Sequence, residues 1–140
     1  MEQCLPNCIG IVPLGKVWLK FTVAQRRILM SQELYRECIE ACIRCAQACE
    51  HCATACLSEQ DVTKMAACIR LDRDCAEACW TASALMSRGS QFASQFCELC
   101  ANICDACAAE CSTHKMDHCR QCAQECKRCA EECRNMATAV

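Results

Sequence analysis

Small and apolar residues recur every three or four positions along most of the chain, and this spacing predicts long amphipathic helices. Glycine and proline, which would interrupt helices, are rare, with 3 and 2 residues respectively. From Met30 onward the pattern predicts four helices. Their predicted ranges are 32–57, 62–88, 91–112 and 118–137.

Polar or glycine-containing segments separate these predicted helices. Ser31 is placed to cap the first helix, and Ser58 or Asp61 to cap the second. Residues 88–90 (Arg-Gly-Ser) combine a C-terminal glycine with an N-cap serine, and residues 112–117 form the last polar turn. Because short connections place consecutive helices antiparallel, we expect an all-α, up-down-up-down four-helix bundle.

The first 30 residues follow a different pattern, since they hold both prolines and two of the three glycines. Two interpretations are open. The segment is either an N-terminal extension, including a non-native start ahead of Met30, or a short helix over roughly Val17–Met30 that packs on the bundle. We therefore expect an extension over residues 1–30 and a bundle domain over residues 31–140.

The inward seam of the predicted helices consists mainly of cysteine. On the first, third and fourth helices the cysteines are spaced alternately three and four residues apart, which places their sulfurs on one stripe. The second helix has fewer, in register with Met65, Asp72 and Met86. Of the 21 cysteines, only Cys4 and Cys8 lie outside the pattern. The inward cysteines are Cys38, Cys42, Cys45, Cys49, Cys52, Cys56, Cys68, Cys75, Cys79, Cys97, Cys100, Cys104, Cys107, Cys111, Cys119, Cys122, Cys126, Cys129 and Cys133.

Charge and hydropathy argue against some partners and indicate the compartment in which these cysteines act. A formal net charge of -2 over 140 residues argues against a nucleic-acid partner, which would require a basic face. The N-terminus lacks a clean export signal and no apolar run approaches the length of a membrane span, so we expect a cytoplasmic protein without a membrane partner. In a reducing cytosol, dense cysteine indicates metal binding rather than disulfides.

Neither core filling nor disulfide bonding accounts well for the cysteine stripe. Free cysteine can fill a core as a small hydrophobe, but replacing a whole seam of Leu, Ile and Val would sacrifice apolar burial. Disulfides require a geometry that a straight helix rarely supplies, and the number of cysteines is odd. We therefore interpret the stripe as a metal-binding core.

The soft thiolate ligand selects Cu(I), zinc or iron–sulfur clusters. Zinc held by four thiolates would leave negative charge in the core, whereas Cu(I) ions shared by bridging thiolates leave it nearly neutral. We expect multiple Cu(I) ions. A metallothionein-like protein for zinc or soft-metal detoxification, and a thiol redox protein, remain as alternatives.

The two ends of the predicted bundle differ in chemistry. Met65, His114 and His118 gather at one end and are candidate copper ligands at an entry point. We expect Asp72, on the seam of the second helix, to support the thiols rather than bind metal directly. His51 falls on the outer face. The opposite end is expected to hold a hydrophobic plug of Tyr35, Met86, Phe92, Phe96 and Met136.

Repeated Cys-x-x-Cys-x-x-x-Cys runs, such as those at residues 42–49 and 119–126, resemble the bacterial four-helix-bundle copper storage proteins. The resemblance covers residues 31–136 and is strongest to the cytosolic branch. It implies a homotetramer of bundles, each holding many Cu(I) ions, with a copper donor or chaperone as partner. It also implies copper storage and buffering, with no enzymatic activity and no catalytic residues.

Overall fold

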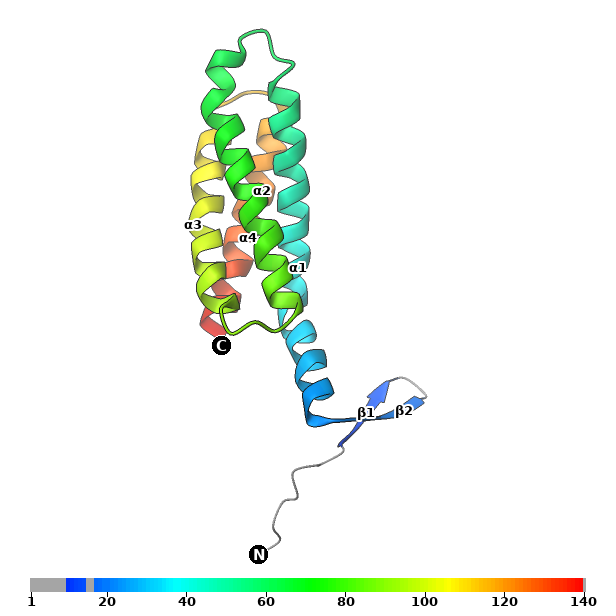
Figure 1. The fold of residues 1–140 in the computed structure, drawn as a ribbon. Coiled ribbons are helices and arrows are strands. Elements are labelled where there is room, and N and C mark those ends of the chain that lie inside the picture. Colours follow the sequence, from blue (N-terminus) through cyan, green and yellow to red (C-terminus); the bar gives the residue numbers. More distant parts are fainter. Residues whose placement is uncertain (1–9, 15–16, 140) are drawn as a thin grey trace, which may run out of the picture.

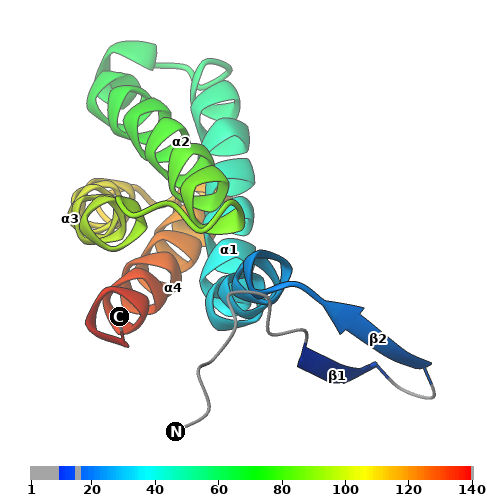
Figure 2. The ribbon, with the colours of Figure 1, turned by 60° about the horizontal axis from the view of Figure 1, so that its bottom comes forward.

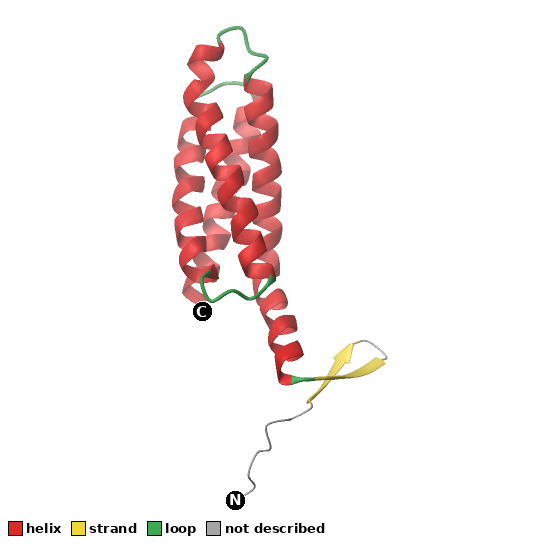
Figure 3. Ribbon diagram, viewed as in Figure 1, coloured by secondary structure: helices red, strands yellow, loops and turns green. Residues whose placement is uncertain are grey.

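The computed structural model describes residues 10–14 and 17–139, and four long helices in this part of the chain form an antiparallel bundle (Figure 1, Figure 3). A short 3-10 helix, η1 (Val62–Met65), precedes the second of them. The up-down-up-down bundle predicted from the sequence is therefore confirmed. Its helices are α1 (Val23–Cys56), α2 (Ala66–Ser87), α3 (Ala93–Cys111) and α4 (Asp117–Ala139).

Each helix packs against two others around a shared core. Helix α1 contacts α2 and α4, and α3 contacts the same two helices from the opposite side (Figure 2). The α1–α2 and α3–α4 connections lie at one end, which we call the histidine end because His114 and His118 lie there. The opposite end carries the α2–α3 connection, and we call it the methionine end after Met86 and Met136.

Small side chains let the four helices approach closely. Most buried positions that are not cysteine are alanine, which favours helix and occupies little volume. Larger apolar groups pack the methionine end, where Tyr35, Met86 and Met136 are buried and Phe96 is half-buried. Phe92 departs from the predicted plug. It lies in the α2–α3 connection and is 57% exposed.

The α2–α3 connection forms the glycine turn expected from the sequence. Gly89 has a φ of 62°, a left-handed conformation that other residues adopt at a cost. The Ser90 amide donates to the Leu85 carbonyl at 2.9 Å and the Gly89 amide to that of Met86 at 3.0 Å. This pair of bonds is a Schellman motif, which ends α2 and reverses the chain.

Helix α1 begins at Val23, so the predicted start at residue 32 with Ser31 as the cap was wrong. Thr22 caps the helix instead. Its hydroxyl accepts the Gln25 amide at 3.2 Å, and the Gln25 side chain accepts the Thr22 amide at 2.8 Å. Because residues 23–30 contain neither glycine nor proline, nothing interrupts the helix between this capping box and the bundle.

A β-hairpin precedes α1 and was not predicted. Strands β1 (Gly10–Leu14) and β2 (Val17–Phe21) pair antiparallel, from Gly10 opposite Phe21 to Leu14 opposite Val17. The alternative of a helix over Val17–Met30 is therefore wrong for its first five residues, which are rich in β-branched and aromatic types. The hairpin and the first turns of α1 extend away from the bundle (Figure 1, Figure 2).

None of the helices in the described residues is long and apolar enough to cross a membrane.

Candidate metal centre

The structure places all 19 cysteines of the predicted stripes inside the bundle. Each is free, and the most exposed of them, Cys38, is only 2% exposed. Neighbouring sulfurs lie between 3.5 and 4.0 Å apart, far beyond the length of about 2.05 Å for a disulfide. We call this continuous array of sulfurs the sulfur column.

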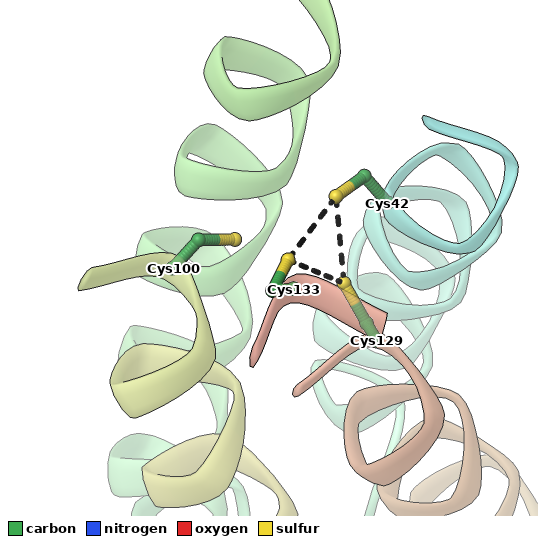
Figure 4. Close-up of side chains that lie close together, drawn as sticks. All are labelled: Cys42, Cys100, Cys129 and Cys133. Carbon is green, nitrogen blue, oxygen red and sulfur yellow. Dashed lines mark hydrogen bonds between the residues drawn. The ribbon is translucent and has the colours of Figure 1, made fainter. Parts of the chain in front are cut away.

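At the methionine end the column begins with contacts between α1 and α4. The Cys42 sulfur lies 3.7 Å from that of Cys133 and 3.6 Å from that of Cys129, and the latter two are 3.9 Å apart (Figure 4). Cys38 joins through Cys133 at 3.6 Å. The sulfurs of Cys42, Cys129 and Cys133 form a set of four with that of Cys100 from α3, and all four lie within 4.8 Å of one another.

In the middle of the bundle all four helices contribute sulfurs. Cys79 of α2 lies 3.7 Å from both Cys104 of α3 and Cys129 of α4. Cys75, one turn earlier on α2, lies 3.6 Å from Cys104 and 3.8 Å from Cys45 of α1. Because these contacts share sulfurs, each site opens directly onto the next along the axis.

The sulfur spacing suits metal ions shared between thiolates. With metal–sulfur bonds of about 2.3 Å, as for zinc thiolates, three sulfurs around one ion would lie about 4.0 Å apart and two on opposite sides about 4.6 Å. Sets of four sulfurs that meet this spacing recur along the column within 4.8 Å. They include Cys45/Cys49/Cys75/Cys126, Cys45/Cys75/Cys79/Cys104, Cys49/Cys107/Cys122/Cys126 and Cys52/Cys56/Cys68/Cys119.

Cysteine pairs one turn apart on the same helix contribute to this array. Cys107 and Cys111 lie 3.9 Å apart, as do Cys122 and Cys126. Contacts between helices are equally close or closer, such as the 3.5 Å between Cys68 and Cys111. The binding sets are therefore assembled mainly across helices, and the sequence spacing captured only their intrahelical part.

Asp72 lies within the column and is fully buried. Its Oδ1 accepts thiol hydrogen bonds from Cys107 at 3.2 Å and from Cys111 and Cys122 at 3.3 Å, and Cys68 lies 3.6 Å from its Oδ2. These donors come from three helices. The contacts agree with the expectation that Asp72 supports the thiols.

Burial raises the pKa of three groups in this centre, Asp72, Cys56 and Cys119. Desolvation, together with repulsion from Cys122, raises the pKa of Asp72 from 3.8 to about 8. Desolvation likewise raises the pKa of Cys56 to about 11, and raises that of Cys119. Without metal, these groups hold their protons near neutral pH, so a bound cation would displace protons from the thiols.

His118 closes the column at the histidine end. Its Nδ1 lies 3.4 Å from the Cys119 sulfur and 3.5 Å from that of Cys52. Its Nε2 lies 2.9 Å from Glu59 Oε1, an arrangement that directs the Nδ1 lone pair toward the thiols. The sequence interpretation missed Glu59, although the two connections at this end were expected to lie side by side.

Met65 and His114 lie at the same end but differ in their contacts. Met65 is buried, 3% exposed, within the same core cluster as the cysteines. His114 makes its polar contact with Glu110, at 3.1 Å from Nε2 to Oε1, rather than with a sulfur. His118 is therefore the candidate that the structure brings to the thiols. Cys4 and Cys8 lie outside the described residues.

A profile of the copper storage protein family matches residues 31–138. Among curated proteins, the uncharacterized cysteine-rich protein YhjQ of Bacillus subtilis is 52% identical over 70 residues. This alignment takes in 49% of the chain and 65% of the relative, so it spans somewhat less than two thirds of that protein.

Solved structures that are similar to the chain in both fold and sequence include two copper storage proteins. The Cu(I)-bound copper storage protein BsCsp3 is 50% identical, with a TM-score of 0.72, over 74% of this chain and 98% of its own. A cytosolic copper storage protein from Streptomyces lividans, loaded with five coppers, is 39% identical, with a TM-score of 0.75, over 79% of this chain and 98% of its own. With its cysteine column and a family match across the bundle, the chain belongs to the copper storage protein family.

Proposed function

We propose that this chain stores and buffers copper in the cytosol by binding many Cu(I) ions through its core thiolates. The observation that carries the proposal is the unbroken sulfur column, in which sets of four buried sulfurs lie within 4.8 Å of one another. We infer storage without catalysis from the match to the copper storage protein family. The metal-binding residues are the 19 column cysteines, with His118, Met65 and His114 at the entry end.

Charge favours Cu(I) over zinc in this core. Asp72 and Ser83 are the buried polar residues in the described part of the chain, and neither supplies positive charge. A zinc ion with four thiolates would leave two uncompensated negative charges at each site. Cu(I) ions equal in number to the thiolates leave the column neutral, which makes Cu(I) the better cargo.

Burial also disfavours the thiol redox alternative. A redox-active cysteine needs an accessible thiolate of low pKa beside a resolving partner. The column thiols are at most 2% exposed, and desolvation opposes their ionisation at Cys56 and Cys119. These conditions suit metal storage better than disulfide exchange with a protein partner.

The remaining assignments rest on the family. We infer a homotetramer of bundles and a copper donor or chaperone as partner. We also infer that residues 31–140 form the copper-binding domain and residues 1–30 an extension. The family match over residues 31–138 supports the domain bounds, and the Streptomyces protein described as cytosolic supports the proposed compartment.

Anaerobic titration of the reduced protein with Cu(I), against a chromophoric chelator, tests the storage function. We expect tight binding of a number of ions close to the 19 column thiols, in a protein already helical without metal. Saturation at a few equivalents would contradict storage. Displacement of the bound copper by equimolar Zn²⁺ would instead favour the zinc alternative.

A further inference from the structure

A cavity outside the sulfur column lies between α1 and α4, toward the histidine end. Its volume is about 320 Å³, at the lower limit for small-molecule sites. The lining is polar and carries both signs of charge. It consists of Arg44, Gln47, Ala48 and His51 from α1 and of His118, Gln121, Cys122 and Glu125 from α4.

The opposite charges in this cavity are incompletely satisfied. Arg44 Nη2 lies 3.7 Å from Glu125 Oε1, which is too long for a hydrogen bond. Glu125 Oε2 is buried and has no hydrogen-bond partner among the described residues. A buried carboxylate oxygen without a donor is costly, so a ligand that supplies one would bind favourably. The 55%-exposed Arg44 side chain retains donors for an anion.

The same cavity borders the sulfur column. Cys122, which lines it, lies 3.6 Å from the Cys49 sulfur and 3.9 Å from that of Cys126. His118 lines it too, and its Nδ1 faces Cys52 and Cys119. The cavity wall therefore includes two of the proposed metal-binding residues, Cys122 and His118.

We propose that this cavity binds a small thiol of the amino-acid class that carries Cu(I), with its carboxylate on Arg44 and its ammonium on Glu125. The proposal rests on the storage function and names the class of copper donor. Copper then passes to the column by ligand exchange. The bond from Cu(I) to the carrier sulfur breaks, a bond to a column thiolate forms, and the thiol proton goes to the departing carrier. Copper stays in the Cu(I) state throughout.

Recognition can be tested without copper. S-methylcysteine has the ammonium and carboxylate of the carrier but cannot bind copper as a thiolate. Titrating it into the reduced apo protein should shift the NMR amide signals of Gln47 and Gln121. Arg44→Gln and Glu125→Gln should each weaken this binding by about tenfold, the effect of one lost charge-assisted hydrogen bond.

Arg73→Gln and Glu50→Gln are the matched controls. They remove a pair of the same chemistry, with Arg73 Nη1 2.8 Å from Glu50 Oε2, which links α2 to α1 away from the cavity. Both control variants should bind S-methylcysteine like the wild type. Equal weakening in all four variants, or no shift at Gln47 and Gln121 in the wild type, would overturn the proposal.

Loading kinetics test the transfer step. In stopped-flow experiments, Arg44→Gln should slow loading from a Cu(I)–cysteine complex about tenfold, yet leave the rate from Cu(I)–acetonitrile unchanged because that donor lacks both charged groups. Equal rates for Arg44→Gln and wild type with Cu(I)–cysteine would overturn the proposal. Failure of the storage function is distinguishable, since the wild type would then bind few equivalents from either donor.

Discussion

Asp72 places an acidic group inside a core made of thiols. A carboxylate there would repel the thiolates that bind metal, and its raised pKa of about 8 keeps it protonated near neutral pH. It can then share hydrogen bonds with Cys107, Cys111 and Cys122 without adding charge. A single side chain thus links the protonation of the core to the stability of the apo protein.

The stability of the apo protein should fall as pH rises through the neutral range. The pKa of Asp72 is raised from 3.8 to about 8 on folding, so its contribution is fully present below pH 3.8 and is lost as pH rises toward 8. Between pH 5 and pH 7 the unfolded chain has lost this proton and the folded protein keeps it. The free energy of unfolding should therefore fall by about 1.4 kcal/mol per pH unit from this group.

Asp72→Asn isolates that contribution, because the amide has the same shape and does not titrate. Urea unfolding of the reduced, metal-free proteins at pH 5 and pH 7 measures it. We expect the wild type to lose roughly 2 to 3 kcal/mol more than the variant over this interval. The same loss in both proteins would show that Asp72 is not protonated in the fold.

At the scale of the element, each helix carries a cysteine stripe flanked by alanine. Ala76 on α2 lies between Cys75 and Cys79 in the sequence and is fully buried, whereas Ala84 on the same helix is exposed. Alanine at such positions sets how closely two helices approach. The sulfur distances across helices therefore depend on residues that bind no metal.

Enlarging this alanine should damage the column without removing a sulfur. Ala76→Leu adds three carbons to a packed core and should destabilise the apo protein by about 1–3 kcal/mol. The separated helices should also bind fewer Cu(I) ions tightly. Urea unfolding and chelator competition measure the two effects, with Ala84→Leu as the control. A variant with full stability and full copper content would contradict this role for alanine.

The sequence predicted the four bundle helices correctly, but it did not predict the β-hairpin or the first turns of α1. The alternating spacing of the cysteines follows from helix geometry, so the bundle and the buried stripe could be derived from it. The start of α1 was missed, although Thr22 and Gln25 have the spacing of a capping box and Ser31 is followed by Leu34 at the corresponding position. The structure has both hydrogen bonds of the capping box at Thr22 and an uninterrupted helix from there to the bundle.

At the scale of the whole molecule, the bundle and the N-terminal hairpin are distinct parts. The hairpin extends from the first turns of α1, and the family match begins only at residue 31 (Figure 1). For the candidate site, the sequence was sufficient to predict which residues face inward. Which sulfurs meet across helices, and the contact of His118 with Glu59, depend on packing that no spacing along one helix encodes.

Removal of residues 1–22 should leave the copper centre intact. The truncated chain keeps all of α1 and the 19 column cysteines and loses only Cys4 and Cys8. We expect the same helical content per bundle and Cu(I) equivalents within about two of the full-length protein, one for each thiol removed. Circular dichroism and chelator competition measure these. A collapse of copper content would place the N-terminal segment in the binding machinery.

His118 closes the column at the histidine end with a side chain that is 14% exposed, while Tyr35, Met86 and Met136 are buried at the other end. If copper enters and leaves at the histidine end, the sites nearest that end exchange first, so such a store works as a stack in which the last ion in is the first out. Protein half-filled with a light copper isotope and completed with a heavy one should release the heavy isotope first to a chelator. Mass spectrometry of the released copper would show this order, and equal proportions would mean that the ions change places faster than they leave. A stack of this kind keeps its oldest copper longest, so the ions near the methionine end form a reserve that turns over only when the store is nearly empty.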